Sequence, residues 1–374
     1  MPDEKTILKI INLVKDAQGV DFTFYKHNTI IRRIQRRISI NKLADFEKYF
    51  ELLEKSETEQ SILYKELLIG VTNFFRDTEA MSIVGQNVIP NIFANKNNNE
   101  QLRAWVVGCS KGEEAYSIAI MLQEYMERTG KHHDIRIFAT DIDQNSIDFA
   151  SAGIYPDNIA IDVSEERLQK FFTKSDNTYK INDKIRGMIV FAVHNILRDP
   201  PFSKIDLVSC RNLLIYLQPV LQKKVLSLFS FSLTPNGYLF LGSSESLGEL
   251  FSYYKSFNAK WKIFQRDDSS KESPIYDLFK PAPKKLSKHF SDFEATENKT
   301  NSEEQDSTRT IQDKALSDSE LYLVLFQRII DLEHKIELTK EILTAEIEEL
   351  KKRNEELKAK FNPDLRRGRD SNPR

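Results

Sequence analysis

Cysteine is scarce in this sequence, and its scarcity argues against stabilisation of the fold by disulfides or by a zinc site. Only Cys109 and Cys210 occur among the 374 residues. Each ends an apolar run that is typical of a β-strand, so we predict two small buried side chains rather than a disulfide. Free thiols are typical of a reducing compartment, which favours the cytoplasm. Two cysteines without neighbouring histidines do not make a zinc site, and we predict no metal centre.

Long apolar runs and a surplus of one charge are also absent. No run reaches the roughly 18–20 apolar residues that span a bilayer, so we predict no membrane insertion. The first ten residues, MPDEKTILKI, lack the basic region and cleavage site of a signal peptide. The 54 basic and 56 acidic residues give a net charge of −2, which argues against nucleic acid as a partner.

The pattern of apolar residues divides the first 266 positions into two parts. Residues 1–75 are predicted to form short helices. Residues 76–266 alternate strand-like apolar runs with amphipathic helices, which predicts an α/β domain with a doubly wound, mostly parallel sheet. Near its end, the turn TPNG before the run GYLFLG, together with the later run KWKIFQR, predicts an antiparallel hairpin that closes the edge of the sheet.

The last hundred residues change character twice. Residues 267–315 are rich in Ser, Lys, Asp, Glu and Thr and are predicted to be a disordered linker. A long helix is predicted over 316–361, because apolar residues recur every seven positions, as in a coiled-coil seam that would join two copies in a homodimer. Residues 362–374 do not continue this pattern and are set aside as a truncated or non-native tail. The heptad positions are Ile329, Ile336, Leu343, Leu350 and Leu357.

A group of four arginines stands out in the helical part of the chain. They occupy the opposite face of a predicted helix from isoleucines that would pack inward. Like charges at this spacing repel one another, which is unusual for a face that serves solubility alone. Two interpretations stay open, a solvated face or a docking surface for an acidic partner. The four residues are Arg32, Arg33, Arg36 and Arg37.

The strongest local signal is a strand, turn and helix at 102–126. Gly108, Ser110 and Gly112 keep the turn small, so a ligand can approach the backbone at a helix N-terminus. The next strand ends in Asp141, which places a carboxylate at the carboxyl edge of the sheet. Two ribose hydroxyls need two acceptors, and an ionised aspartate supplies them. The turn and the carboxylate together favour a nucleoside-binding site over a turn without a ligand.

Three other motifs compete with this interpretation. GCSKG matches the nucleophile elbow of serine hydrolases, with His194 as a possible base, but no oxyanion loop or earlier strand accompanies Ser110. A nicotinamide site would need a G-x-G-x-x-G run, whose middle and last glycines are missing. Asp199-Pro200-Pro201-Phe202 is similar to the D-P-P-[YF] box of amino methyltransferases that act on nucleic acid. Here the box precedes its strand, so we interpret it as a proline-stiffened loop.

Four motifs in one order give the chain a resemblance to a known family. They are TNFFRD at 72–77, GEE at 112–114, DID at 141–143 and CRNLLIY at 210–216. Over about residues 5–266 the chain resembles the chemotaxis receptor glutamate methyltransferases, often called CheR. The resemblance implies a small all-helical domain before a class I methyltransferase domain that uses S-adenosylmethionine. It also implies glutamate γ-methyl esters on chemoreceptor cytoplasmic helices and S-adenosylhomocysteine as the product.

Carried over position by position, the resemblance implies a complete cofactor pocket. Glu114 would hold the amino group of the methionine moiety, and Asp141 would hold the ribose hydroxyls. Asn195 and Ile196 would flank the adenine. The adjacent Glu113 is interpreted only as a helix N-terminal charge. The cofactor-binding set is Gly70, Thr72, Arg76, Gly108, Glu114, Asp141, Asn195, Ile196, Arg211 and Asn212.

By the same resemblance, Arg76 and Tyr216 would stand closest to the transferred methyl group. A glutamate side chain with a pKa near 4.3 is already ionised at neutral pH, so the reaction needs no general base. The task is to align carboxylate, methyl and sulfur, and an arginine fork can hold the carboxylate. The rival hypothesis is a non-catalytic module that binds S-adenosylmethionine and senses or scaffolds within a signalling fusion.

The chain departs from the family pattern in two segments. Receptor tethering in the family uses a glycine-rich turn in a small β-subdomain, expected here at about 160–190, but residues 172–180 contain no glycine. The missing glycine leaves two interpretations open, docking with tethering and docking without it. The linker and long helix resemble those that join such domains to sensory domains, so the substrate is either a chemoreceptor or a related signalling protein.

Overall fold

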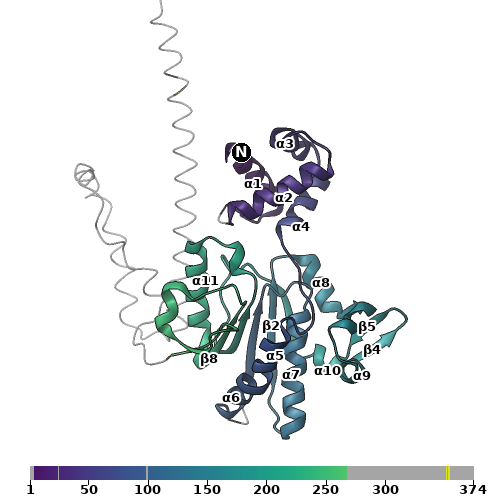
Figure 1. Cartoon of the computed structure of the whole chain (residues 1–374), viewed down its shortest axis with the longest axis vertical. Coiled ribbons are helices and arrows are strands. Elements are labelled where there is room, and N and C mark those ends of the chain that lie inside the picture. The colour runs from purple at the N-terminus through teal and green to yellow at the C-terminus, as the bar shows by residue number, and fades with distance from the viewer. Residues whose placement is uncertain (1–3, 24, 98–99, 268–350, 352, 354–374) are drawn as a thin grey trace, which may run out of the picture. The chain divides into compact units, whose positions relative to one another are not determined.

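Figure 1 shows the helices and strands of the computed structural model. The predicted linker, the long helix with its coiled-coil dimer and the C-terminal tail lie outside the described residues, apart from isolated positions. Among the residues that are described, no helix has both the length and the apolarity needed to cross a membrane. The described residues are 4–23, 25–97, 100–267, Lys351 and Arg353.

Four helices form the N-terminal part of the described chain and enclose a core of their own (Figure 1). Their buried residues recur at helical spacing, as Ile30, Ile34 and Ile38 do along one face of the second helix. Asp45 and Ser56 begin the last two helices, where each side chain accepts an amide hydrogen bond from the first turn. The helices are α1 (Glu4–Gln18), α2 (His27–Ile40), α3 (Phe46–Lys55) and α4 (Glu57–Leu67).

The predicted basic face of α2 needs one correction, at Arg37. This side chain is buried, and its Nε and Nη2 donate to the Glu59 carboxylate at 2.8 and 2.7 Å. Its Nη1 donates to Glu66 at 3.3 Å. Arg37 lies three residues after Ile34 on the edge of the apolar face, so the helix carries it into the domain interior. Arg37 therefore belongs to a buried ion pair and not to a docking surface.

A seven-stranded sheet forms the second part of the chain. Its order is β6-β2-β1-β7-β8-β10-β9, and the first five strands are parallel. The order reverses between β1 and β7, where open α/β sheets bind their ligands. This confirms the predicted doubly wound, mostly parallel sheet with antiparallel strands at one edge. The strands are β1 (Leu102–Val107), β2 (Ile135–Asp141), β6 (Ile189–Val193), β7 (Ile205–Cys210), β8 (Leu233–Leu241), β9 (Tyr254–Asn258) and β10 (Ile263–Arg266).

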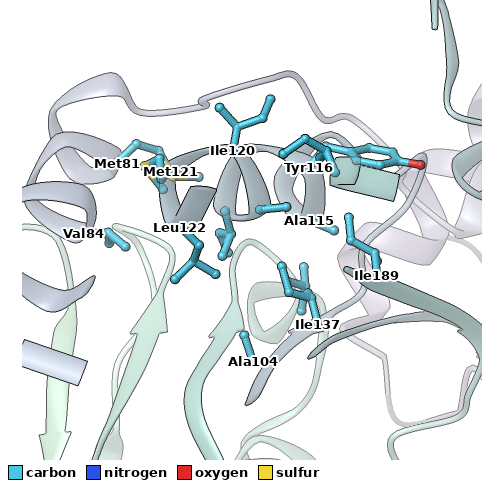
Figure 2. Packing of buried hydrophobic residues seen from close by; sticks show 14 of the residues in the cluster. Met81, Val84, Ala104, Ala115, Tyr116, Ile120, Met121, Leu122, Ile137 and Ile189 are labelled. Carbon is cyan, nitrogen blue, oxygen red and sulfur yellow. The ribbon is translucent and has the colours of Figure 1, made fainter. Parts of the chain in front are cut away.

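Helices cover both faces of this sheet. Alternate residues of β1 therefore point into different cores, with Ala104 in one and Trp105 in the other. Figure 2 shows Ala104 and Ile137 from neighbouring strands packed beneath Leu122 of α7. Burial on both faces explains why the central strands are apolar throughout. The helices around the sheet are α5 (Thr78–Ile83), the π-helix η1 (Val84–Val88), α6 (Ile89–Ala94), α7 (Glu113–Thr129), α8 (Gln144–Ala152), α11 (Pro219–Ser232) and the short 3₁₀ helices η3 (Leu214–Tyr216) and η4 (Gly248–Tyr253).

The antiparallel edge forms, but not through the predicted turn. TPNG at 234–237 lies inside β8, which continues parallel to β7 after a register shift. Asn236, at φ +60°, makes this bend without reversing the chain. The antiparallel pairs are β8 with β10 and β10 with β9. The prediction of a hairpin at TPNG was wrong, because a turn signal does not show whether the strand continues beyond it.

A second, three-stranded antiparallel sheet lies beside the main one, in the order β3-β5-β4. Its hairpin joins β4 to β5 through Asp176 and Asn177, and Asp176 takes φ +46°. Aspartate tolerates this left-handed conformation, so the turn forms without a glycine. The elements are β3 (Ile154–Pro156), η2 (Asp157–Ile161), α9 (Glu165–Phe171), β4 (Phe172–Ser175), β5 (Thr178–Ile181) and α10 (Asp183–Arg186).

Candidate active site

A cleft opens at the carboxyl ends of β1, β2 and β7, where the strand order reverses. The structure brings together at this cleft every residue predicted for cofactor binding and catalysis, although these residues come from segments more than a hundred positions apart. The predicted residues that line it are Gly70, Thr72, Arg76, Gly108, Glu114, Asp141, Asn195, Ile196, Arg211, Asn212 and Tyr216.

The turn after β1 has the tight backbone that its small residues predict. Gly108, Ser110 and Gly112 have φ values of +65°, +48° and +91°. At Gly112 a Cβ would lie 2.8 Å from the Cβ of Ala150, so a larger residue would push α7 away from α8. Glycine is needed here for packing as well as for conformation.

Asp141 ends β2 and faces the cleft with part of its side chain accessible. Its Oδ2 accepts the Ser110 amide at 2.8 Å, and its Oδ1 accepts the Asp143 amide at 3.0 Å. Burial raises the pKa of this carboxyl above its ordinary value, while the amide hydrogen bonds act in the opposite direction. A carboxylate has about four lone-pair sites. Asp141 is therefore held in place and still has acceptor sites for two hydroxyl groups.

An ion-pair network crosses the floor of the cleft. Glu114, in the first turn of α7, accepts the Ser209 hydroxyl at 2.6 Å and Arg211 Nη1 at 3.0 Å. Arg211 Nη2 donates to Asp77 at 2.6 Å and to the carbonyl of Arg76 at 3.0 Å. The Arg211 side chain is only 1% exposed, so these partners stabilise its charge. Arg211 thereby ties α7 to the segment that carries Arg76.

The two predicted catalytic residues both line the cleft and come from different segments of the chain. Arg76 follows two buried phenylalanines, and its Nη1 donates to the carbonyl of Val71 at 2.8 Å. A guanidinium has five N–H donors, so this bond leaves others available to an anion. Tyr216 is partly exposed in the cleft, and its backbone carbonyl accepts the Lys26 amide at 2.9 Å.

The segment after β6 forms the far wall. Asn195 Oδ1 accepts the Leu197 amide at 3.0 Å, and its own amide donates to Asp199 at 2.7 Å. These bonds shape a turn that presents Ile196, which packs against the apolar cluster on that side of the sheet. This wall therefore combines an apolar surface with the edge of an amide group, which suits a planar heterocycle.

The helical domain supplies a wall that the sequence did not predict. Val20, Asp21 and Tyr25 line the same cleft. Burial, together with the nearby charge of Asp141, raises the pKa of Tyr25 to about 12, so its hydroxyl stays protonated. These residues lie far from every recognised motif and carry no periodic signal. Only the tertiary contact between Tyr25 and Leu217 reveals them.

The surroundings of Ser110 and His194 agree with setting aside the serine-hydrolase interpretation. The Ser110 hydroxyl lies 3.4 Å from the carbonyl of Gly70, and His194 Nε2 lies 3.0 Å from the carbonyl of Pro200. Ser110 and His194 thus contact different carbonyl groups and do not pair with each other as nucleophile and base. Glu113 lies in the first turn of α7, where it was predicted, but its carboxyl is buried, and burial raises its pKa to about 7.

The cysteines and the metal prediction can be examined directly. Cys109 and Cys210 are both buried and unbonded, which confirms the prediction of free thiols. Burial raises the pKa of both thiols. Among the described residues, no cluster of three or more His, Cys, Asp or Glu side chains could hold a metal ion.

Comparisons with known proteins agree with this geometry. Residues 70–263 match the family model of the CheR methyltransferase SAM-binding domain, and residues 5–68 match that of the CheR all-alpha domain. A chemotaxis protein methyltransferase of Listeria innocua is 32% identical over 248 residues, which are 66% of this chain and 92% of that protein. An uncharacterised 104.1 kDa protein of Rhodobacter capsulatus is 39% identical over 257 residues. This match covers 69% of the present chain but only 27% of the Rhodobacter protein.

A putative O-methyltransferase of Nostoc punctiforme is a more distant structural neighbour, with 12% identity and a TM-score of 0.25 over 44% of this chain and 38% of that one. The family assignment instead rests on the two matched domains, which together span the helical domain and the cleft. The matched SAM-binding domain also identifies the cofactor as S-adenosylmethionine. The chain belongs to the CheR methyltransferase family.

Proposed function

We propose that this protein is a glutamate O-methyltransferase that transfers a methyl group from S-adenosylmethionine to glutamate side chains of a chemoreceptor or a related signalling protein. One observation carries the proposal. A single cleft is lined by the Asp141 carboxylate, by Glu114 in its ion-pair network with Arg211, and by Arg76 and Tyr216. We propose that these groups serve a nucleoside, an amino acid moiety and an incoming carboxylate.

The residues fit this cofactor chemically. Asp141 keeps acceptor sites for the ribose hydroxyls, and the closed turn at Gly108 lets the backbone approach the ligand. Glu114 keeps negative charge near the Arg211 guanidinium and can accept a further hydrogen bond from an ammonium group. Asn195 and Ile196 are proposed to flank the adenine, and Gly70 and Thr72 to cover the ligand from the connecting segment.

Arg76 and Tyr216 are proposed to act on the substrate. When bound, S-adenosylmethionine supplies a methyl group on a sulfonium that is already electrophilic. Arg76 would hold the substrate carboxylate through its free N–H donors, and the Tyr216 hydroxyl would fix its approach. The described cleft contains no serine–histidine pair, and an ionised carboxylate needs none. Catalysis would then depend on alignment and on charge balance in the transition state.

The three remaining arginines of α2 are proposed to dock acidic helices of the substrate. Arg32 and Arg36 are exposed, unlike Arg37. We expect Arg32→Glu with Arg36→Glu to lower substrate methylation strongly while cofactor affinity stays unchanged. The loss should shrink as salt rises, because exposed charges are screened over about 10 Å at 0.1 M. Arg33, which is partly exposed, would contribute to the same surface.

The control for this test is a charge reversal elsewhere in the same domain. Lys48 and Lys55 are exposed on α3, so Lys48→Glu with Lys55→Glu changes the net charge equally. Methylation rates measured from low to high salt should separate the two double variants. Equal losses in both would show that net charge, and not the α2 surface, controls the encounter.

The broader organisation follows the same proposal. We propose a helical domain over 1–75 and a methyltransferase domain over 76–266 that contains the small β-subdomain. We also propose a cytoplasmic location, where receptor helices are accessible, and a homodimer through the C-terminal helix.

The decisive experiment uses methyl-labelled cofactor and membranes that contain chemoreceptors. Incubation with the protein should label receptor protein, and mild base should release the label as methanol, because a glutamate methyl ester is base-labile. Label that resists base would indicate another acceptor and contradict the glutamate assignment.

A second candidate is a non-catalytic cofactor sensor within a larger signalling protein. The observation in its favour is the 39% identity to a 104.1 kDa uncharacterised protein, of which this chain covers only 27%. Tight cofactor binding without any transfer of label to receptors or other proteins would support it.

A further inference from the structure

Glu245 follows β8 and lies behind the residues that line the cleft. It is 4% exposed, so its carboxylate is removed from bulk water. Its Oε1 accepts the amides of Leu214 and Ile215 at 2.7 and 3.3 Å. Its Oε2 accepts the amides of Gly242 and Asn212 at 2.6 and 3.1 Å. All four of these partners are backbone groups.

A buried carboxylate of this kind is costly to maintain. Burial raises the pKa of Glu245, because the charged form loses hydration, and the four amide hydrogen bonds oppose this rise. None of the four partners is a cation, so amide dipoles carry the stabilisation. A neutral side chain could fill the same space with less desolvation. The arrangement therefore suggests a purpose beyond filling the core.

Three of the four amides belong to the segment that follows β7. Near its start, Asn212 takes φ +60°. This left-handed conformation costs free energy in a residue other than glycine and persists only where surrounding contacts stabilise it. The segment carries Arg211 and Asn212 at one end and Tyr216 at the other, and all three line the cleft. Glu245 thus joins the ends of β7 and β8 through one side chain.

The close approach of the two strand ends is visible at Gly242. A Cβ there would lie 2.9 Å from the Asn212 amide nitrogen and 2.9 Å from Glu245 Oε2. Such a contact is sterically impossible without movement of the backbone. Glycine at this position lets the carboxylate reach the segment, and the carboxylate then sets its conformation.

We propose that Glu245 is a positioning residue that holds segment 211–216 in the conformation needed for cofactor binding and methyl transfer. The part that concerns Tyr216 rests on the proposed function. The part that concerns Asn212 depends only on binding of the cofactor, so the two can be tested separately.

The primary test is calorimetric affinity for S-adenosylhomocysteine, which needs no protein substrate. Glu245→Gln keeps the size of the side chain but replaces one acceptor oxygen by a donor, which would face amides that also donate. We expect about tenfold weaker binding, as is usual when buried amides lose their acceptor. The matched control is Glu249→Gln, four residues later, where an exposed carboxylate pairs with Lys223 at 2.6 Å. Its affinity should equal that of the parent chain.

A double-variant cycle separates positioning from general weakening of the fold. Asn212→Gly removes the side chain and tolerates the positive φ. If Glu245 acts through Asn212, the double variant should bind S-adenosylhomocysteine with about the same affinity as the single variant that binds it more weakly. Independent, multiplying losses would overturn the proposal, as would parent-like affinity in folded Glu245→Gln.

Folding is checked by circular dichroism before binding is measured. Should Glu245→Gln not fold, Glu245→Asp replaces it in the same cycle, because it keeps the charge and both oxygens but shortens their reach. Turnover is then measured with receptor membranes. If the parent chain gives no turnover, the proposed function fails while the calorimetric cycle still decides the role of Glu245.

Discussion

Asp141 and Glu245 are both carboxylates at the strand-end edge of one sheet, yet their surroundings differ. Asp141 accepts amides from Ser110 and Asp143 and lines the cleft. Glu245 accepts four amides within 3.3 Å and is almost fully buried. Asp141 is held in place but keeps free acceptor sites, whereas all acceptor sites of Glu245 are occupied by protein amides; we call the first kind of group unsaturated and the second saturated. Unsaturated groups can bind a ligand, and saturated groups stabilise the fold.

The same distinction separates two neighbouring arginines of α2. Arg37 is saturated by Glu59 and Glu66, while Arg36 is exposed and lies 3.9 Å from Glu66. Within the cleft, Arg211 donates through Nη1 and Nη2 to Glu114, Asp77 and the Arg76 carbonyl, although its Nε has no partner among the described residues, whereas Arg76 Nη1 donates to the carbonyl of Val71. Changes to saturated groups should therefore reduce stability, and changes to unsaturated groups should reduce binding or turnover.

The largest effect is expected from Arg37→Ala. It leaves the Glu59 carboxylate buried without its cation, a loss that costs about 3–5 kcal/mol in similar pairs. Arg36→Ala should change stability by less than about 0.5 kcal/mol, because that pair is exposed and long. Urea unfolding of the two variants and the parent measures the difference. Equal midpoints for Arg37→Ala and Arg36→Ala would break the distinction between saturated and unsaturated groups.

Arg76→Ala and Tyr216→Phe test the unsaturated groups at the rim. Arg76→Ala removes the proposed cation for the substrate carboxylate and should lower kcat roughly 100-fold. Tyr216→Phe removes one hydroxyl and little volume, so about a tenfold loss is expected. Cofactor affinity should stay near that of the parent in Tyr216→Phe, because Tyr216 is not among the residues predicted to bind the cofactor. Parent rates in both variants would make these residues structural and favour the sensor hypothesis.

Asp141→Ala should reduce affinity without a matching loss of stability. Hydroxyl groups that lose their acceptor typically cost about 1–3 kcal/mol of binding. Calorimetry with S-adenosylhomocysteine measures the loss, and the melting temperature without ligand provides the control. An unchanged affinity in the folded variant would assign the ribose to another residue.

Glu113 is a third carboxylate, buried with one oxygen, Oε2, that has no recorded partner among the described residues. Burial raises its pKa from 4.5 to about 7, so the folded state binds this proton more tightly than the unfolded state. The stability that its protonated form contributes is complete below pH 4.5 and is lost as the pH rises toward 7, by on the order of 3 kcal/mol. Glu113→Gln should remove this loss and become more stable than the parent at pH 8.

The control for this pH series is Glu249→Gln. The Lys223 partner lowers the pKa of Glu249 below 4.5, so this carboxyl is ionised in both the folded and the unfolded state above about pH 5. Melting temperatures from pH 5 to 8 should therefore show a constant difference between Glu249→Gln and the parent, and a difference that grows with pH for Glu113→Gln. A constant difference between Glu113→Gln and the parent across that range would show that Glu113 is ionised throughout.

Much of the fold was predictable because its signals are local. The central parallel strands are rich in apolar residues, and two of them are marked at their ends, β1 by the following Gly108 and β2 by its last residue, Asp141. Strand β9, at Tyr254–Asn258, was missed because it is short and mostly exposed. The TPNG signal was misplaced because a bend at Asn236 and a chain reversal use the same residue types.

The site was predictable where motifs mark it and not where tertiary contacts create it. Arg76 and Tyr216 lie in recognisable motifs, and the structure brings both to the cleft. Tyr25 and Glu245 have no motif of their own, and their roles depend on contacts with segments far along the chain. Arg37 shows the limit of helical periodicity, since a position at the edge of an apolar face can point either way.

The contact between the first helices and the segment after β7 has a consequence for dissecting this protein. Tyr25 pairs with Leu217, the Lys26 amide donates to the Tyr216 carbonyl, and Gln218 donates to two carbonyls of the same stretch. The segment that carries Tyr216 is thus held by hydrogen bonds to Glu245 and by contacts with the N-terminal part of the chain. A fragment that begins near residue 70 would keep the sequence motifs but lose the contacts with the N-terminal part. Chimeras that exchange the helical part between relatives would therefore also change the contacts that hold the Tyr216 segment of the cleft.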